Sequence, residues 1–404
     1  MKIGIISHSP LWTTGFGVTC SCIANALSNA CHDVYCFCLG EDELPEKTSS
    51  FKIYNANWSK AYADLSAFLK QETPDTLIIN FDINAVGYFI KFCKLLSWRG
   101  DIFAHIVMDG FPVYDDLLQT IKNINGIIVP TKASRKYLQS EGIKNVYYAP
   151  HGVDIKKFMP LPNKENIRRK LGLKNKVEKR FIIGVFAKNE ERKQIPKVLL
   201  ALHYLIFSLK QKNILLYLHT QAKPDLKKGW DLEFIVNKLN LNKYVIFTSK
   251  SFRQDKGVDR NFDPSIQTAT KQLSYVERLN MCDLIVNIPF SGGFELGNIE
   301  AQACGVPLIT IDDNGNIKEV VGESACLIKP AMKNIWGNGA WIYLVDEIDL
   351  ASKILQFKND TALQISIRQM GLENARKFSW VKLEKTVQKM VVSEAEFSEA
   401  QSNY

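Results

Sequence analysis

Short hydrophobic runs rich in β-branched residues alternate along the chain with stretches whose apolar positions recur at helical spacing. The runs of the first half lie at residues 2–7, 33–39, 76–81, 102–108, 126–130 and 146–150. A second series lies at residues 180–187, 214–219, 244–249, 284–289, 307–312 and 325–330. Apolar strands that alternate with amphipathic helices are typical of parallel sheets joined by crossover helices. The pattern predicts an α/β protein with doubly wound sheets.

Prolines and charged residues interrupt this alternation between residues 151 and 180. The interruption predicts an interdomain connection, with Rossmann-like domains at 1–165 and 166–384. Two open parallel sheets that face each other form a central cleft at the carboxyl ends of their strands, where such sheets bind ligands. From residue 346 onward the apolar spacing is helical to the end of the chain.

Composition fits this architecture. The chain has 404 residues, of which 46% are hydrophobic and 23% charged, as expected for a folded globular protein with more than one domain. No apolar run approaches the roughly 20 residues that span a bilayer, and the first residues do not resemble a secretory signal. The nine cysteines lie largely in apolar stretches without metal-ligand spacing, which predicts free thiols and a cytoplasmic setting.

The basic charge is unevenly distributed. Residues 1–165 carry 16 Lys and Arg and 16 Asp and Glu, so the whole net charge of +9 falls in the remainder. Ten basic and three acidic residues lie between Arg168 and Lys193. Such a run is compatible with a solvated helix face, an anion site or contact with an anionic membrane, and charge alone does not choose. The balanced first half offers no basic face for nucleic acid, and no basic stripe interleaved with aromatics appears, so no nucleic-acid partner is expected.

Two loops at predicted strand ends carry candidate binding residues. Gly15 and Gly17 follow the first strand, which fits either a plain strand-to-helix turn or a loop that contacts a ligand. Lys188, Arg192 and Lys193 follow the first strand of the second half. They form either a solvated basic loop or a site for an anion such as a diphosphate.

A third loop, "SGGFELGNIEAQACGVPLI", begins at Ser291. Its glycines allow close backbone approach, Asn298 is a candidate N-cap, and Gly305 is expected to end the helix. Glu300 lies in the first turn, where it either stabilises the helix dipole or accepts hydrogen bonds from a pair of sugar hydroxyls. No Asp-x-Asp motif stands at a strand end, so no metal ligand is predicted.

This third segment resembles the donor-site segment of retaining glycosyltransferase family 4. "YYAPHGVDIKKFMP", "AKNEERK", "NGNIKEVVG" and "ARKFSWVKL" are also similar to segments of that family, in the same order over nearly the whole chain. The resemblance implies a GT-B fold, with an acceptor domain at 1–165 and a donor domain at 166–384. It also implies that the last helix, at about 385–404, packs back on the first domain.

The resemblance further implies roles for individual residues. Lys188 and Lys193 would hold the donor diphosphate beside Arg192, and Glu300 would bind the ribose. The residues expected to line the diphosphate and sugar are Gly293, Phe294, Glu295, Leu296, Gly297 and Asn298. The loop with Gly15 and Gly17 would contact the donor from the side of the first domain. The family generally neutralises the leaving diphosphate with basic side chains and helix amides, so neither metal nor cofactor is expected beyond the nucleotide-diphosphate-sugar co-substrate.

The sequence departs from the family pattern at two places. Gly292 stands where the family has a glutamate that contacts the transferred sugar, and Glu295 replaces a glycine three residues later. At the end of the strand 102–108, Met108 and Asp109 stand where the family has a histidine, with His105 further back. We therefore take Lys188, Lys193, Glu295 and Asp109 as the candidate catalytic residues.

The leading hypothesis is a metal-independent retaining glycosyltransferase, resembling hexosyltransferases, that moves a sugar from a nucleotide-diphosphate donor to a hydroxyl. The alternative is a non-catalytic nucleotide-sugar-binding subunit that supports a partner transferase, which Gly292 favours. A dinucleotide-dependent oxidoreductase would need G-x-G-x-x-G, which the segment from Gly15 lacks. The acceptor stays open among glycan, lipid-linked and protein hydroxyls. A peripheral membrane contact stays open as well, through "LWTTGF" or the basic segment after Ile167.

Overall fold

The computed structural model describes residues 1–40, 48, 50–170, 179–224, 229–249, 273–313 and 315–392. It divides into two compact units. The first comprises Met1–Gly152, Gly337–Ala340 and the segment from Ser379, and the second comprises Val153–Trp336 and Trp341–Phe378. The chain passes from the first unit to the second at Gly152, earlier than the expected boundary at residue 165.

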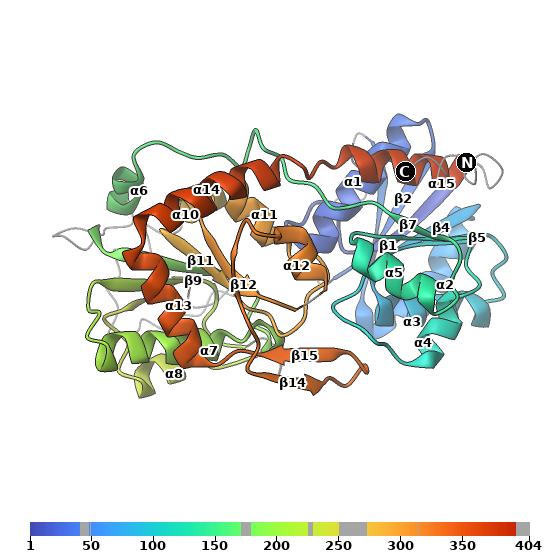
Figure 1. Ribbon diagram of the computed structural model, residues 1–404. Coiled ribbons are helices and arrows are strands. Elements are labelled where there is room, and N and C mark those ends of the chain that lie inside the picture. The colour runs from blue at the N-terminus through green and yellow to red at the C-terminus, as the bar shows by residue number, and fades with distance from the viewer. Residues whose placement is uncertain are drawn as a thin grey trace. The chain divides into compact units, whose positions relative to one another are not determined.

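The first unit is built on a seven-stranded sheet of order β3-β2-β1-β4-β5-β6-β7 (Figure 1). Its paired strands are parallel. The strands are β1 Lys2–Ser7, β2 Asp33–Leu39, β3 Lys52–Ala56, β4 Thr76–Asp82, β5 Asp101–Val107, β6 Gly126–Val129 and β7 Val146–Tyr148. Its helices are α1 Gly15–Asn29, η1 Trp58–Lys60, α2 Ala61–Glu72, α3 Ile83–Leu95, α4 Asp115–Ile121, α5 Lys132–Ser140 and α15 Val381–Val392.

The second unit contains a six-stranded parallel sheet of order β10-β9-β8-β11-β12-β13 and a separate hairpin, β14-β15. Its strands are β8 Phe181–Phe186, β9 Ile214–Gln221, β10 Val245–Ser249, β11 Leu284–Asn287, β12 Leu308–Ile311, β13 Cys326–Ile328, β14 Met332–Ile335 and β15 Trp341–Leu344. Its helices are α6 Lys164–Lys170, η3 Glu191–Lys193, α7 Ile195–His203, η4 Tyr204–Ser208, α8 Leu232–Lys238, α10 Tyr275–Asn280, α11 Leu296–Ala303, α12 Asn316–Val321, α13 Glu347–Asn359 and α14 Thr361–Ala375.

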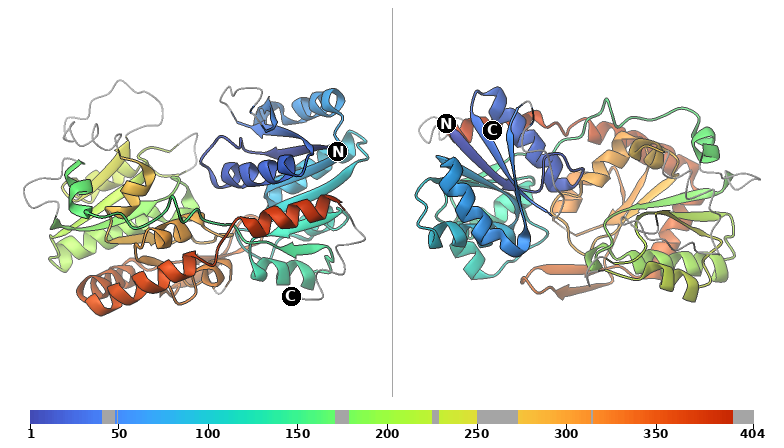
Figure 2. Two further views of the ribbon diagram at one scale, coloured as in Figure 1. Left: turned by 90° about the horizontal axis from the view of Figure 1, so that it is seen from above. Right: turned by 180° about the vertical axis from the view of Figure 1, so that it is seen from behind.

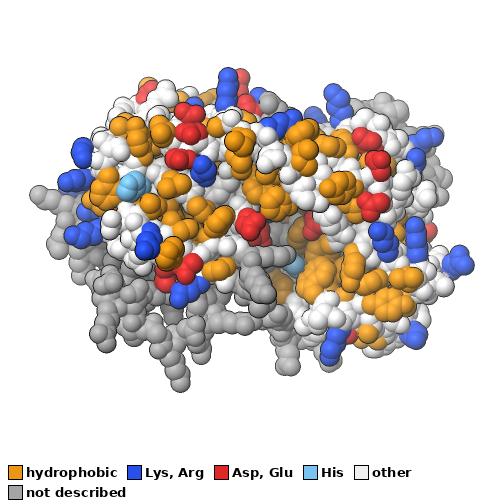
Figure 3. Space-filling model, turned by 90° about the horizontal axis from the view of Figure 1, so that it is seen from below, with side chains coloured by type: hydrophobic (Ala, Val, Ile, Leu, Met, Phe, Trp, Pro, Cys, Tyr) orange, Lys and Arg blue, Asp and Glu red, His pale blue; other side chains and the backbone are white. Residues whose placement is uncertain are grey.

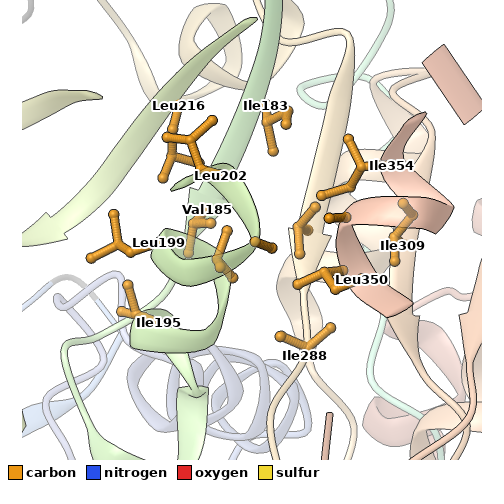
Figure 4. Close-up of a cluster of buried hydrophobic side chains, with 14 of the residues drawn as sticks. Ile183, Val185, Ile195, Leu199, Leu202, Leu216, Ile288, Ile309, Leu350 and Ile354 are labelled. Atoms are coloured by element: carbon orange, nitrogen blue, oxygen red, sulfur yellow. The ribbon is translucent and has the colours of Figure 1, made fainter. Parts of the chain in front are cut away.

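Each sheet buries both faces under helices, which explains its nearly continuous apolar strands (Figure 2). In the second unit, Ile183 and Val185 of β8 pack with α7 and α13, whereas Ile182 faces the opposite layer. Figure 4 shows the first of these layers, with Leu199 and Leu202 of α7 on one side and Leu350 and Ile354 of α13 on the other. The doubly wound α/β architecture expected from the sequence is confirmed.

The last described helix packs within the first unit although its sequence follows the second. Leu383 and Val387 of α15 are buried in one cluster with Cys20 and Ile23 of α1. The Gln388 side-chain amide donates to the Ala26 carbonyl at 2.7 Å. The α15 helix thus begins at Val381, before the expected start at about residue 385, and residues 393–404 lie outside the described part of the chain.

The hydrophobic pattern missed three strands. β3, "KIYNA", is a short edge strand with polar positions, and all of β14, "MKNI", is exposed. β15, "WIYL", is an apolar run that the expectation overlooked, and it pairs with β14 in a two-stranded sheet. The absence of β3 and β14 from the expectation has a physical reason, because strands with little burial carry no clear apolar signature. Among the described residues, no helix combines the length and hydrophobicity needed to cross a bilayer.

Candidate functional site

The candidate site of the second unit lies where two neighbouring parallel strands end. β8 and β11 are adjacent in the sheet, and the chain order reverses between them. Such a switch point is where open α/β sheets bind ligands. The loop after β8 leads into η3, and the loop after β11 leads into α11. The Phe290 amide donates to the Arg192 carbonyl at 2.7 Å and holds the two loops together.

Two cations converge on Glu295 in these loops. The Lys193 ammonium donates to both carboxylate oxygens, at 2.7 Å to Oε1 and 2.5 Å to Oε2. Arg192 Nη1 donates to Oε1 at 2.9 Å, and Asn287 Nδ2 donates to Oε2 at 3.1 Å. The side chains of Lys193 and Glu295 are only 8% and 9% exposed. Charge-assisted bonds of this kind are strong because little water screens them.

The surroundings of Glu295 fix its charge. Burial by itself raises the pKa of this carboxyl, but Lys193 and Arg192 outweigh burial and lower the pKa to about 2. Glu295 is therefore ionised at every physiological pH. Its carboxylate cancels part of the positive charge that the sequence suggested for an external anion.

The backbone at Glu295 is unusual and directs the side chain away from its own helix. Glu295 has φ 59°, in the left-handed region that a residue with a side chain rarely adopts. It is the N-cap of α11 but makes no side-chain cap hydrogen bond. Instead the side chain folds back over Gly292. A Cβ atom at Gly292 would lie 2.8 Å from Glu295 Oε1 and 2.9 Å from its Cγ, so the acid at 295 fills the space above the glycine at 292.

Lys188 does not join this pair. Its side chain is 68% exposed, and its ammonium lies 3.1 Å from Glu190 Oε1. Glu190 also contacts Arg192 Nε at 3.3 Å. Burial raises the pKa of Glu190, but Arg192 and Lys188 reverse that shift and hold the pKa below its usual value. The three expected cations thus surround two carboxylates, with Lys193 buried and Lys188 at the edge.

Glu300, on α11, lies in a less polar environment. Burial raises its pKa to about 7, and a hydrogen bond donated by the Tyr275 hydroxyl at 3.1 Å offsets only part of that rise. The Tyr275 ring lies edge-on to Phe186 at 5.6 Å between centroids and 5.4 Å from the His219 ring. Phe186 ends β8 and His219 lies near the end of β9, so at the strand ends two rings lie against Tyr275, which donates to Glu300.

Sequence reasoning missed these aromatic neighbours. Phe186 and His219 stand at the ends of strands that the pattern located, which is the signal that would have identified them. Tyr275 opens a helix marked by the capping box of Ser274 and Glu277, but that motif predicts a helix start and no contact with Glu300.

Several residues of the third loop have structural positions. Asn298 is not an N-cap: α11 begins at Leu296, and the Asn298 Oδ1 accepts a hydrogen bond from Asn287 at 2.7 Å. Phe294 is 1% exposed and packs edge-on against Phe378, so its ring belongs to the core. Gly293 is buried before it, and Leu296 and Gly297 form the half-buried first turn of α11.

The remaining predicted residues belong to the first unit. Gly15 and Gly17 lie in the first turn of α1, and neither has a positive φ. Gly17 is needed for packing, because a Cβ atom there would lie 2.5 Å from the Trp12 carbonyl oxygen. Asp109 is half-buried after β5. His105 is fully buried on β5, with Nδ1 2.8 Å from Asn80 Oδ1 and Nε2 3.2 Å from His151 Nε2.

The arrangement in the second unit offers three kinds of interaction to a ligand. Arg192 and Lys193 supply positive charge, the start of α11 supplies the positive end of a helix dipole, and Glu300 supplies an acceptor for hydroxyl groups. Among the described residues, no group of three or more His, Cys, Asp or Glu side chains is placed to hold a metal ion.

Comparison with known proteins finds similarity in structure alone. No protein-family model matches the sequence, and no curated protein matches it. Among solved structures, sucrose-phosphate synthase from Thermosynechococcus elongatus is 16% identical, with a TM-score of 0.72, over 99% of this chain and all of that chain.

Two further similar structures contain a bound nucleotide. HepE from Anabaena, in complex with UDP, is 16% identical with a TM-score of 0.66, over 97% of this chain and 99% of that one. The E. coli trehalose-6-phosphate structure bound with UDP-2-fluoro glucose is 14% identical with a TM-score of 0.67, also over 97% and 99%. With its two parallel-sheet Rossmann-like units, the chain has the GT-B fold of these glycosyltransferases.

Proposed function

We propose that the protein transfers a sugar from a nucleoside-diphosphate sugar to a hydroxyl group, with retention of anomeric configuration and without a metal ion. One observation carries the proposal: Lys193 and Arg192 meet Glu295 at the start of α11, and the hydroxyl acceptor Glu300 lies further along the same helix at the sheet's switch point. Five residues separate Glu295, at the cation pair, from Glu300, or about 7.5 Å along a helix. That separation suits a diphosphate at one end and the ribose at the other.

The chemistry needs no protein nucleophile. The bond between the anomeric carbon and the diphosphate oxygen breaks, and the acceptor oxygen bonds to the same face of that carbon. The departing diphosphate oxygen takes the proton of the acceptor hydroxyl. Lys193 and Arg192 stabilise the charge that develops on the diphosphate, so catalysis consists of positioning and electrostatic stabilisation. Glu295 stands near Gly292, where it can accept a hydrogen bond from a hydroxyl of the transferred sugar.

UDP-sugars come first among candidate donors because two similar structures hold UDP or a UDP-sugar derivative. The experiment is thermal unfolding of the purified protein with UDP, GDP, ADP and their sugars in the presence of a chelator. We expect one nucleoside diphosphate to raise the melting temperature and one of its sugars to raise it further. No shift with any compound would contradict a nucleotide-sugar site.

The non-catalytic alternative has one observation in its favour. The cation pair that should meet the diphosphate is already bonded to Glu295. Under this alternative the donor binds, yet no sugar is released to any acceptor or to water. Measuring donor turnover therefore separates a transferase from a nucleotide-sugar-binding subunit.

For the peripheral membrane contact we propose a surface on α3. Tyr88 and Leu95 are 45% and 71% exposed, and Phe92 lies between them on the same helix face with its ring 4.1 Å from that of Tyr88. Aromatic residues beside lysines such as Lys91 suit the interface of an anionic bilayer. Figure 3 shows a face of the molecule on which hydrophobic side chains lie among charged ones in both units.

The basic segment that the sequence suggested for the membrane contact has other partners. Arg168 contacts Asp283 at 2.6 Å, and Lys170 contacts Glu277 at 2.8 Å. These ion pairs bind α6 to α10 and the residues that follow it, within the second unit. The acceptor hydroxyl belongs to a glycan, a lipid-linked molecule or a protein. We also propose a cytoplasmic location, which suits the nine free thiols.

A further inference from the structure

Glu295 satisfies the cation pair that an external diphosphate would need. Its carboxylate receives hydrogen bonds from Lys193, Arg192 and Asn287, the number and type of contacts that a phosphate oxygen pair would receive. With both side chains less than 10% exposed, the Lys193 and Glu295 pair has little water to screen it. The site therefore contains an anion that the chain itself supplies.

The local backbone shows that this arrangement is built in. Glu295 holds a left-handed conformation that glycine adopts without steric cost, and its side chain extends into the space that Gly292 leaves open. A side chain at position 292 would collide with the Glu295 carboxylate. The glycine and the acid are thus complementary: the first makes room for the second.

We propose that Glu295 is an internal competitor of the diphosphate, occupying Lys193 and Arg192 until a donor displaces it. This inference rests on the proposed function, and it adds a preference of the site between nucleotide-sugar and nucleoside diphosphate. The displaced carboxylate can bond to a hydroxyl of the donor sugar, whereas a free nucleoside diphosphate offers it no such partner. The site therefore favours nucleotide-sugar over the nucleoside diphosphate product, which Glu295 helps to expel by returning to the cations.

The test uses inorganic pyrophosphate as the probe, measured by calorimetric titration of the full chain at low ionic strength. Glu295→Gln keeps the shape of the side chain and removes its charge. Glu295→Gly removes the side chain and suits the backbone at φ 59°. We expect both variants to bind pyrophosphate at least about tenfold more tightly than wild type, because a negative charge a few ångströms from the anion is gone. For the same reason, the preference for nucleotide-sugar over nucleoside diphosphate should shrink.

Glu190→Gln is the charge-matched control. The Glu190 carboxylate contacts the same Arg192 and the exposed Lys188, its backbone carbonyl accepts from the Lys193 amide at 3.0 Å, and its side chain is 29% exposed. Its loss should change pyrophosphate affinity by less than about threefold. If Glu190→Gln gained as much pyrophosphate affinity as the Glu295 variants, the proposal would be overturned. The change in net charge, and not the release of the cations by Glu295, would then explain the tighter binding.

The remaining outcomes separate this inference from the proposed function. If wild type binds nucleotide-sugar and both Glu295 variants bind pyrophosphate no better, the inference fails while the function stands. If neither wild type nor any variant binds nucleotide-sugar or pyrophosphate, the cations form no anion site and the proposed function fails with it. Thermal unfolding without ligand shows that each variant is folded before either conclusion is drawn.

Discussion

Replacing Glu300 by glutamine should stabilise the folded protein at alkaline pH while weakening its nucleotide binding. Burial raises the pKa of Glu300 from 4.5 to about 7, and the hydrogen bond from Tyr275 offsets only part of that rise. The folded state therefore holds this proton more tightly than the unfolded chain does. The resulting stability is fully present below pH 4.5 and is lost as pH rises through 7.

The size of the effect follows from the shift. At 1.36 kcal/mol per pH unit, the difference between 4.5 and about 7 corresponds to about 3 kcal/mol of unfolding free energy. Glutamine has the shape of the protonated acid and does not titrate. Glu300→Gln should thus be more stable than wild type by about 3 kcal/mol at pH 8 and by less than about 1 kcal/mol at pH 5.

Urea denaturation of both proteins at pH 5, 6, 7 and 8 measures this difference, and Glu300→Asp serves as a control that still titrates. Binding of a nucleotide-sugar, measured at pH 8, should weaken in Glu300→Gln by about 1–3 kcal/mol through loss of an ionised acceptor. A stability difference that is the same at every pH would refute the reasoning, because Glu300 would then not be a buried acid with a raised pKa. A gain in stability without loss of binding would remove Glu300 from the site.

Three further predictions test other parts of the structure. Lys193→Met should weaken nucleotide-sugar binding by about 1–3 kcal/mol, whereas Lys188→Met, at a side chain that is 68% exposed, should cost less than about 1 kcal/mol; equal losses in titration would contradict the different placement of the two lysines. Burial lowers the pKa of His105 to about 3. As pH falls below 6.5, this imidazole therefore takes up a proton in the unfolded chain before it does so in the folded protein. The protein should then lose about 2 kcal/mol of stability by pH 5 through this group, and a His105→Gln variant with an unchanged acid profile in denaturation would refute that origin. Leu95→Glu should reduce co-sedimentation with vesicles containing anionic phospholipid, while Ile365→Glu, at a 65% exposed position of the second unit, should not; equal behaviour of the two variants would exclude a membrane contact specific to α3.

The strands with buried faces could be predicted from the sequence because burial on both sides leaves a continuous apolar run. β1 and β8 show this directly, since Ile3, Ile5, Ile182 and Ile183 are almost fully buried. Exposure explains why β14 was not predicted, since this strand is exposed at every position. The ends of the strands also located the segments that carry Lys193 and Glu295, because parallel strands place their carboxyl ends on one edge of the sheet.

The contacts within the site could not be predicted from sequence. Residue spacing placed Lys188, Arg192 and Lys193 in one loop but did not show that η3 turns Lys193 inward and leaves Lys188 at the surface. The sequence showed that Glu295 replaces a glycine of the resembled motif. Only the three-dimensional structure shows that its carboxylate lies over Gly292, because that position depends on a left-handed backbone at one residue.

The measurement that tests the central claim most directly is slow hydrolysis of the donor. A nucleotide-sugar that raises the melting temperature would be incubated with the protein and a chelator, and the anomeric proton of the released sugar followed by NMR. We expect release with the anomeric configuration of the donor, and loss of that release in Lys193→Met. Release with inverted configuration would contradict the retaining mechanism, and binding without any release would contradict the transferase and leave a nucleotide-sugar-binding subunit.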